Sequence, residues 1–299
     1  MNSAIRTEHL VKKFRGVDAV NDLNLDVAEG AIYALVGPNG SGKTTAIKVM
    51  MNIFPATSGK AEILGIDSAS LAGRAFEPVG YVSENQKLPD WMPVGALLAY
   101  LRPFYSQWDQ ALEGDLVKQF QLPLDRKLGK LSRGMRMKAA LVASLAYHPK
   151  LIVLDEPFGG LDPLVRDELI EGLLDRASET TIFLSSHDLA EIENLASHVG
   201  YIEQGKLRFS DEMSSLVQRF REVDLTFDAP PSPPETLPPS WMHMQLGPSV
   251  ARFIESQFDQ DRTRSEILAA FGRVRDVAFT PMTLRSIFLA MAKSGRASA

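Results

Sequence analysis

Short runs of consecutive apolar residues recur along the first two thirds of the chain and indicate strands that are buried on both faces. The clearest runs are Ile32–Val36 and Leu151–Leu154, and Ile182–Leu184 is a shorter candidate. Leu23–Val27 instead alternates apolar and polar residues, as a half-exposed strand does. This mixture, with helical patterns over residues 43–51, 135–147, 163–176 and 188–196, predicts an α/β fold with a mainly parallel sheet.

A long stretch from about residue 86 to residue 144 lacks a convincing buried strand and predicts a mostly helical insertion into the α/β core. The stretch is rich in aromatic residues, namely Trp91, Tyr100, Phe104, Tyr105 and Trp108. Aromatic stripes in helical segments most often fill a core, so we favour packing over ligand binding for these side chains.

Six prolines crowd into residues 229–239, a segment that forms neither a regular helix nor a central strand. Strand-like and helix-like pieces flank it and predict a small α+β module around a proline-rich loop, without a catalytic constellation of its own. We therefore expect a large domain over residues 1–219 and an accessory domain over residues 220–299. The strand-like pieces are Val223–Phe227, Trp241–Leu246 and Val274–Phe279, and the helix-like pieces are Ser265–Phe271 and Thr283–Ala292.

The buried run that ends at Val36 leads directly into a glycine-rich turn that closes with Lys-Thr-Thr. Glycines permit the left-handed backbone angles of a tight loop, so that successive N–H groups converge on one anion. The lysine charge suits β- and γ-phosphate oxygens, the threonine hydroxyl suits Mg²⁺, and the following helix presents its positive end. The loop therefore predicts a site for a magnesium nucleotide. The predicted nucleotide-binding residues are Gly37, Pro38, Asn39, Gly40, Ser41, Gly42, Lys43, Thr44 and Thr45, and Thr44 is also a predicted metal ligand.

Two carboxylates, Asp155 and Glu156, follow the buried run that begins at Leu151. Open α/β sheets bind ligands at the carboxyl ends of their strands, which is where these side chains are expected. Asp155 is predicted to hold Mg²⁺, and Glu156 to polarise the water that attacks the γ-phosphate. Taken alone, the pair is equally compatible with a helix cap or a salt bridge.

Two further positions allow a structural and a functional interpretation. His187 ends the buried run that starts at Ile182, which favours a hydrogen-bond donor to phosphate, although isolated histidines are usually structural. Ser132 precedes a helix and is first of all a helix N-cap. The sharper interpretation makes Ser132, the Gly134 backbone and the helix dipole a second anion site.

Composition narrows the class of protein. The chain has 299 residues, a formal net charge of -5 and no cysteine. These values give no global basic field for nucleic acid, and no disulfide framework or thiolate metal site. The N-terminus lacks the apolar core of a signal peptide, and no stretch approaches the roughly 20 apolar residues that span a bilayer. We therefore expect a cytoplasmic protein that reaches a membrane only through a partner.

Read in chain order, five segments resemble the motifs of the nucleotide-binding subunit of ATP-binding cassette (ABC) transporters over about residues 4–219. The resemblance implies a P-loop NTPase core, an antiparallel β subdomain and a helical insertion. The segments are Gly37–Thr45 (Walker A), Leu131–Met135 (signature), Leu151–Glu156 (Walker B), residues 159–162 (D-loop) and His187 (switch histidine).

The same resemblance implies that two such domains, in a homodimer or a heterodimer, enclose two ATP molecules head to tail. Ser132 and Gly134 would then act on the nucleotide of the partner, and Asp162 would line the dimer seam. Glu156 and His187 would hydrolyse the γ-phosphate. Phe14 is similar to an aromatic that stacks on adenine, which fits weak base selectivity.

The chain departs from the family pattern at two places. The signature carries Arg133 and Met135 where Gly and Gln are common, which adds a positive charge and removes an amide. Glu84 stands where many relatives have a glutamine that contacts Mg²⁺ and senses the membrane subunit. Oxygen ligation is retained there, with an added negative charge. Gln86 is an alternative candidate for that role.

Residues 277–290 are similar to the tail of subunits that serve ABC-2 type exporters. This similarity implies a separate polytopic membrane subunit, contacted by the helical insertion near Trp91–Val94. The leading hypothesis is thus the ATPase of a membrane exporter. The alternative is a soluble nucleotide switch acting on a macromolecule, which predicts two cassettes, a coiled-coil insertion or a basic face. A small-molecule kinase would not explain the signature together with His187.

Overall fold

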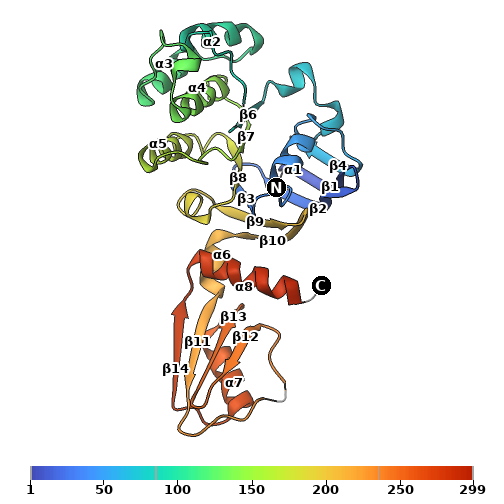
Figure 1. Cartoon of the computed structure of the whole chain (residues 1–299), viewed down its shortest axis with the longest axis vertical. Coiled ribbons are helices and arrows are strands. Elements are labelled where there is room, and N and C mark those ends of the chain that lie inside the picture. The colour runs from blue at the N-terminus through green and yellow to red at the C-terminus, as the bar shows by residue number, and fades with distance from the viewer. Residues whose placement is uncertain (1, 85, 235, 298–299) are drawn as a thin grey trace. The chain divides into compact units, whose positions relative to one another are not determined.

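The computed structural model describes residues 2–84, 86–234 and 236–297 and divides the chain into two compact units, residues 1–210 and 211–299 (Figure 1). The division precedes the boundary predicted after residue 219. Helix α6 (Met213–Arg219) accounts for the difference, because it packs against α8 (Leu284–Ala297) in the second unit. Within the proline-rich segment 229–239, residue 235 lies outside the described residues.

A six-stranded sheet in the order β10-β9-β3-β8-β7-β6 forms the centre of the first unit. Each neighbouring pair from β9 through β3, β8 and β7 to β6 is parallel, as the apolar runs predict. Every residue of β3, β7 and β8 is buried. The strands are β3 (Ile32–Val36), β6 (Val79–Ser83), β7 (Leu151–Asp155), β8 (Thr181–Ser186), β9 (His198–Glu203) and β10 (Lys206–Glu212).

A second, antiparallel sheet in the order β2-β1-β4-β5 shares a core with the parallel one. Helix α1 (Lys43–Met50) contacts β1, β2 and β4 of this sheet and also β7, so it lies between the two sheets. The arrangement confirms the P-loop fold with an antiparallel β subdomain. The strands are β1 (Ser3–Phe14), β2 (Val17–Ala28), β4 (Ser58–Ile63) and β5 (Ile66–Asp67).

The predicted insertion is helical and consists of α2 (Val94–Leu101), α3 (Gln110–Gln119) and α4 (Arg133–Leu145), with α2 and α3 packed on α4. Tyr105 stacks on Tyr147 with 3.8 Å between ring centroids, as the packing interpretation requires. That interpretation is wrong for three other aromatics, because Trp91, Tyr100 and Phe104 are 70%, 59% and 60% exposed.

The helix predicted over residues 188–196 is also wrong. After α5 (Pro163–Leu174) and β8 the chain forms only a short 3₁₀ turn, Leu189–Glu191. Asp188 caps this turn through the Ala190 amide at 3.0 Å, and the Ser197 amide already bonds to Ile32 O, beside the start of β9. The segment between the turn and Ser197 is therefore too short for a regular helix before the chain rejoins the sheet at β9.

The second unit is an antiparallel sheet in the order β12-β13-β11-β14 with helices α7 and α8. Its core includes Val223, Phe253 and Ile267, and Trp241 stacks on Phe253 at 4.0 Å. The sequence did not indicate β13, because its buried face carries the fully buried Glu255 beside Ala251 and Phe253. The elements are β11 (Arg221–Thr226), β12 (Trp241–Leu246), β13 (Val250–Glu255), α7 (Gln260–Phe271) and β14 (Asp276–Pro281).

Candidate nucleotide-binding site

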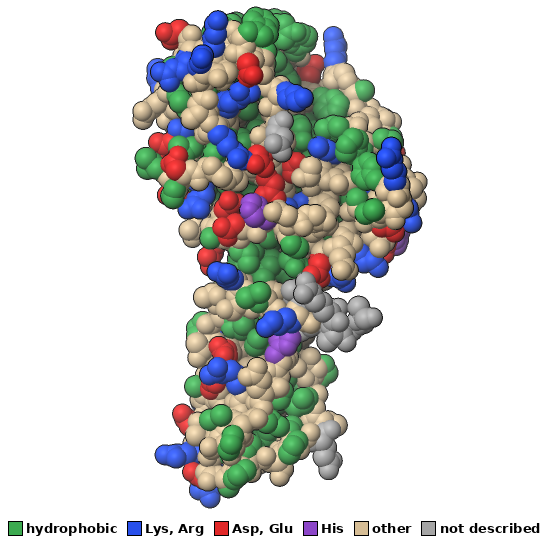
Figure 2. All heavy atoms as spheres, viewed as in Figure 1, with side chains coloured by type: hydrophobic (Ala, Val, Ile, Leu, Met, Phe, Trp, Pro, Cys, Tyr) green, Lys and Arg blue, Asp and Glu red, His purple; other side chains and the backbone are tan. Residues whose placement is uncertain are grey.

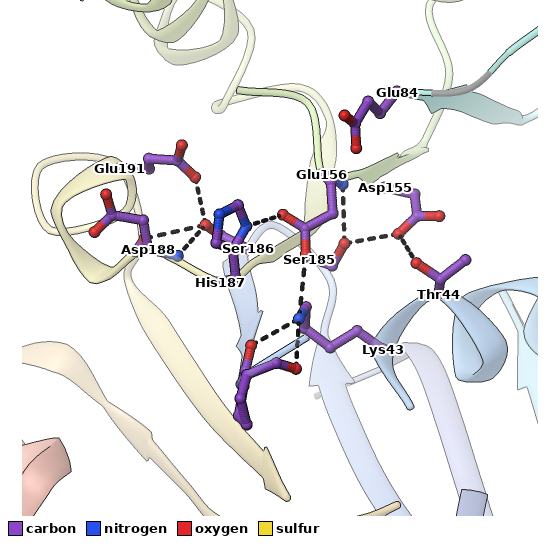
Figure 3. A network of polar contacts seen from close by, with 12 residues as sticks. Lys43, Thr44, Glu84, Asp155, Glu156, Ser185, Ser186, His187, Asp188 and Glu191 are labelled. Carbon is purple, nitrogen blue, oxygen red and sulfur yellow. Dashed lines mark hydrogen bonds and ion pairs between the residues drawn. The ribbon is translucent and has the colours of Figure 1, made fainter. Parts of the chain in front are cut away.

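The carboxyl ends of three neighbouring parallel strands gather the predicted polar residues at one edge of the sheet (Figure 3). The loop after β3 leads to Lys43 and Thr44 at the start of α1, and β7 ends in Asp155 with Glu156 directly after it. His187 follows β8. Because β8 lies between β3 and β7, residues far apart in the sequence meet around one point.

A cleft of about 410 Å³ opens at this edge. Figure 2 shows acidic side chains and a histidine close together on the face of the first unit that is in view. The cleft contains most of the predicted phosphate loop together with the two catalytic candidates. It is lined by Ala19, Asn39, Gly40, Ser41, Gly42, Lys43, Thr44, Thr45, Glu84, Glu156, Gly159, Gly160 and His187.

Glycine is required at two positions of the loop for different reasons. Gly42 has a φ of +108°, and a Cβ atom there would lie 2.3 Å from Ala19 O. Gly37 adopts no unusual φ, but a Cβ atom would lie 2.1 Å from Ile202 O. At these two positions the loop backbone thus packs against its neighbours more closely than any side chain allows.

The Lys43 side chain belongs to the lining of the cleft and is 5% exposed. Its ammonium group donates to Gly37 O at 2.7 Å and lies 3.1 Å from Glu156 Oε1. A buried ammonium needs such partners, because desolvation otherwise penalises its charge. Lys43 therefore connects the phosphate loop to the carboxylate that follows β7.

Asp155 is almost fully buried and accepts two hydroxyl hydrogen bonds at one oxygen. Thr44 Oγ1 donates to Oδ1 at 2.9 Å, and Ser185 Oγ donates to the same atom at 2.8 Å. Burial raises the pKa of the Asp155 carboxyl above its usual value, although these two hydrogen bonds oppose the rise. A cation beside the carboxyl would favour its ionised form.

Glu156 lies between the side chains of Lys43 and His187. Its Oε2 lies 2.7 Å from His187 Nδ1, while Oε1 faces Lys43, so the two partners approach different oxygens (Figure 3). The hydrogen bond to Glu156 raises the pKa of His187, so the imidazole readily carries a proton. Glu156 also has a φ of +53°, a conformation that is uncommon for residues with a side chain.

Two functional candidates were missed from the sequence. Ser185 donates to the Asp155 carboxylate and accepts from the Glu156 backbone amide at 3.0 Å, so it links the Asp155 side chain to the Glu156 backbone. Glu191 receives a hydrogen bond from the Ser186 hydroxyl, and burial raises its pKa. Ser185 could have been predicted from the sequence, because it lies at the end of a buried strand, where a polar side chain needs a hydrogen-bond partner.

The donor set fits Mg²⁺ and phosphate. Mg²⁺ is commonly held by one or two carboxylates together with substrate phosphate oxygens, and Thr44 and Asp155 supply adjacent oxygens. Among the residues that the structure describes, no group of three or more His, Cys, Asp or Glu side chains forms a complete metal cage. The buried Ser41 hydroxyl has no hydrogen-bond partner, as expected of a group reserved for a ligand.

Several predicted site residues do not line this cleft. Phe14 is 41% exposed and meets Phe54 edge to face at 5.5 Å. Ser132 caps α4 through the Met135 amide at 3.3 Å, and Asp162 caps α5 through the Val165 amide at 3.1 Å. Gln86 lines a separate apolar groove, whereas Glu84 lines the cleft, which favours Glu84 of the two alternatives.

A glycine-rich phosphate loop with two carboxylates and a histidine at the carboxyl edge of a parallel sheet defines a P-loop nucleotide hydrolase. Residues 20–159 match the ABC transporter family. The chain is 32% identical over 230 residues to the bacitracin transport ATP-binding protein BcrA of Bacillus licheniformis, with 74% of each chain covered. It therefore belongs to the family of ABC transporter ATP-binding proteins and is an ATPase that energises transport.

Two further comparisons agree. The chain is 28% identical over 226 residues to the ABC transporter ATP-binding protein YtrB of Bacillus subtilis, covering 75% of this chain and 77% of YtrB. A solved ATP-binding subunit of an ABC transporter shares the fold with a TM-score of 0.66 at 24% identity, covering 72% of this chain and 92% of that chain. The family, the fold class and the ATPase activity expected from the sequence are confirmed.

Proposed function

We propose that this chain is the ATP-hydrolysing subunit of a membrane exporter and that two copies, or this chain and a related subunit, close on ATP. The observation that carries the proposal is the convergence of Lys43, Glu156 and His187 in one cleft. Asp155 is joined to the same site through its hydrogen bond from Thr44, which lines the cleft. That group of side chains can bind a nucleotide and direct water at it.

Each side chain has a proposed role in hydrolysis. The loop from Gly37 to Thr45 holds the phosphates through its N–H groups, and Lys43 neutralises the β- and γ-phosphate charge. Thr44 and Asp155, with Glu84 at the mouth of the cleft, hold Mg²⁺, which supplies charge neutralisation of the phosphates when bound. Glu156 accepts the proton of the attacking water. His187, protonated next to Glu156, orients that carboxylate and donates to the γ-phosphate.

The dimer is proposed because Ser132, Gly134 and Asp162 do not line the cleft of their own chain. The start of α4 is nevertheless suited to an anion, since the helix has its positive dipole end there. A second copy brings the start of its α4 to the γ-phosphate of the first. Phe14, at the end of β1, is proposed to stack on adenine.

A membrane partner is proposed to dock on the helical insertion. Its exposed aromatics Trp91, Tyr100 and Phe104 lie near an apolar groove of about 350 Å³ that includes Leu97 and Leu101. Hydrophobic side chains are visible over this part of the first unit, at the top of Figure 2. In the part of the chain that the structure describes, no helix is long and apolar enough to cross a bilayer. The chain is thus proposed to bind peripherally at the cytoplasmic face.

The direction of transport is proposed from the C-terminal resemblance. Residues 277–290, which resemble the tail of ABC-2 exporter subunits, extend from β14 into α8. The accessory unit that contains them is proposed to serve dimerisation or regulation.

A co-purification experiment tests this function. Tagged Glu156→Gln protein is incubated with detergent-solubilised host membranes and Mg-ATP, and bound proteins are identified. Because this variant binds ATP without hydrolysing it, we expect a stoichiometric polytopic membrane protein. The matched control is Lys43→Ala, which lacks the positive charge proposed to neutralise the phosphates and should therefore not form the ATP-closed complex. If only soluble partners are recovered, a soluble nucleotide switch replaces the exporter, and full ATPase activity of Glu156→Gln removes Glu156 as the base.

A further inference from the structure

Two of the three residues at which the sequence departs from the family pattern, Arg133 and Glu84, contact each other. Arg133, the first residue of α4, pairs through Nη2 with Oε1 of Glu84, which follows β6. The Glu84 amide in turn donates to Asp155 O at 3.0 Å. The ion pair thus connects the start of the signature helix to the strand end beside the proposed metal ligand Asp155.

The turn after β7 leaves room for this pair. A Cβ atom at Gly160 would lie 2.8 Å from Arg133 Nη1, and one at Gly159 would lie 3.7 Å from both Arg133 Nη2 and Glu84 Cδ. The guanidinium therefore lies against this turn. The Arg133 side chain is 45% exposed and that of Glu84 is 31% exposed, so a dissolved cation can reach the pair.

Glu84 lines the nucleotide cleft, and its carboxylate is engaged by the guanidinium at Oε1. A guanidinium and Mg²⁺ both bind carboxylate oxygens, and both draw on the same negative charge. Two cations that draw on one carboxylate compete for it. A neutral glutamine at position 84 would offer neither cation a charged oxygen.

We propose that Arg133 is a positioning residue that holds the Glu84 carboxylate in its own chain, so that Mg²⁺ entering the cleft must compete with it. This inference rests on the proposed Mg-ATP function of the cleft. Competition of this kind is reciprocal, so Mg²⁺ binding also loosens the tie between Glu84 and the start of α4.

A double-mutant cycle tests the proposal. The free Mg²⁺ concentration that gives half-maximal binding of a fluorescent non-hydrolysable ATP analogue is measured for the wild type, Arg133→Gln, Glu84→Gln and the double variant. Arg133→Gln should lower this concentration roughly two- to fivefold, as expected for a partly exposed ion pair. The same change in the Glu84→Gln background should have no effect. Arg133→Lys keeps the charge without the planar fork and should shift the concentration less than Arg133→Gln does.

Thermal unfolding of all variants verifies that they fold. An equal shift in both backgrounds would mean that Arg133 acts by long-range charge, and that result overturns the proposal, as does an absent or opposite shift. If the folded wild type binds no nucleotide at any Mg²⁺ concentration, the proposed function fails together with the inference. If the wild type binds nucleotide but Arg133→Gln has the same effect with and without Glu84→Gln, the inference fails and the proposed function stands.

Discussion

At the scale of single residues, the Asp155 carboxyl is buried in a way that works against its own ionisation. It is 3% exposed, and burial raises its pKa above the unfolded value. An acid with a raised folded pKa is fully protonated in both states below its unfolded pKa, so it then costs no stability. As the pH rises through the folded pKa, the unfolded state ionises more readily and the folded state loses stability.

We therefore expect Asp155→Asn to stabilise the metal-free protein at neutral pH while weakening Mg²⁺ binding. Its amide oxygen can still accept from Thr44 and Ser185, and the gain should be of the order of 0.5–2 kcal/mol. Thermal unfolding at about pH 8 and about pH 4 measures it, and the gain should be smaller at the lower pH, which approaches the unfolded pKa. A gain of equal size at both pH values would contradict the role of ionisation.

At the scale of elements, Ser132, the N-cap of helix α4, has one observed role and one proposed role. Ser132 accepts from the Met135 amide and so caps the helix, and the proposed dimer also requires its hydroxyl at the partner nucleotide. Ser132→Ala removes both functions. Ser132→Asp preserves the cap, because aspartate is as good an N-cap as serine, but adds a charge that repels phosphate.

We expect Ser132→Ala to lower the free energy of unfolding by about 1 kcal/mol in chemical denaturation, and Ser132→Asp to leave it near the wild-type value. In a Glu156→Gln background, light scattering should show that both changes abolish ATP-dependent dimerisation. If the aspartate variant still dimerises with ATP, Ser132 is a helix cap without a nucleotide role.

The elements also show how far the sequence determines the site. The buried strands β3, β7 and β8 were predictable from apolar runs, and the polar residues at their ends therefore came together as expected. The contact between Glu84 and Arg133 was not predictable, because these residues are 49 positions apart and meet only through tertiary packing. Strand β4 was missed since only Ala61 and Ile63 of its six residues are buried.

At the scale of the whole molecule, two compact units each have a core of their own, and the nucleotide cleft lies entirely in the first. A ligand that binds one unit stabilises that unit by mass action. At a nucleotide concentration of about 100 times Kd, the stabilisation is about 2.7 kcal/mol.

Scanning calorimetry of the full chain should therefore resolve two transitions, of which Mg-nucleotide raises only one, by several degrees. Lys43→Ala serves as the control, because its transitions should not respond to nucleotide. A single transition that moves as a whole would instead mean that the two units unfold cooperatively.

The contact between Lys43 and Glu156 has a consequence for the idle protein. In the proposed mechanism, the Lys43 ammonium neutralises the phosphates as well as the Glu156 carboxylate, so one cation cannot serve both fully. In the structure, the Glu156 carboxylate is paired with Lys43 as an internal counter-ion. When ATP binds, we expect the Lys43 ammonium to pair with the phosphates and to interact less with Glu156. Binding of ATP would thus free the proposed base, Glu156, so that the base is available only when its substrate is present.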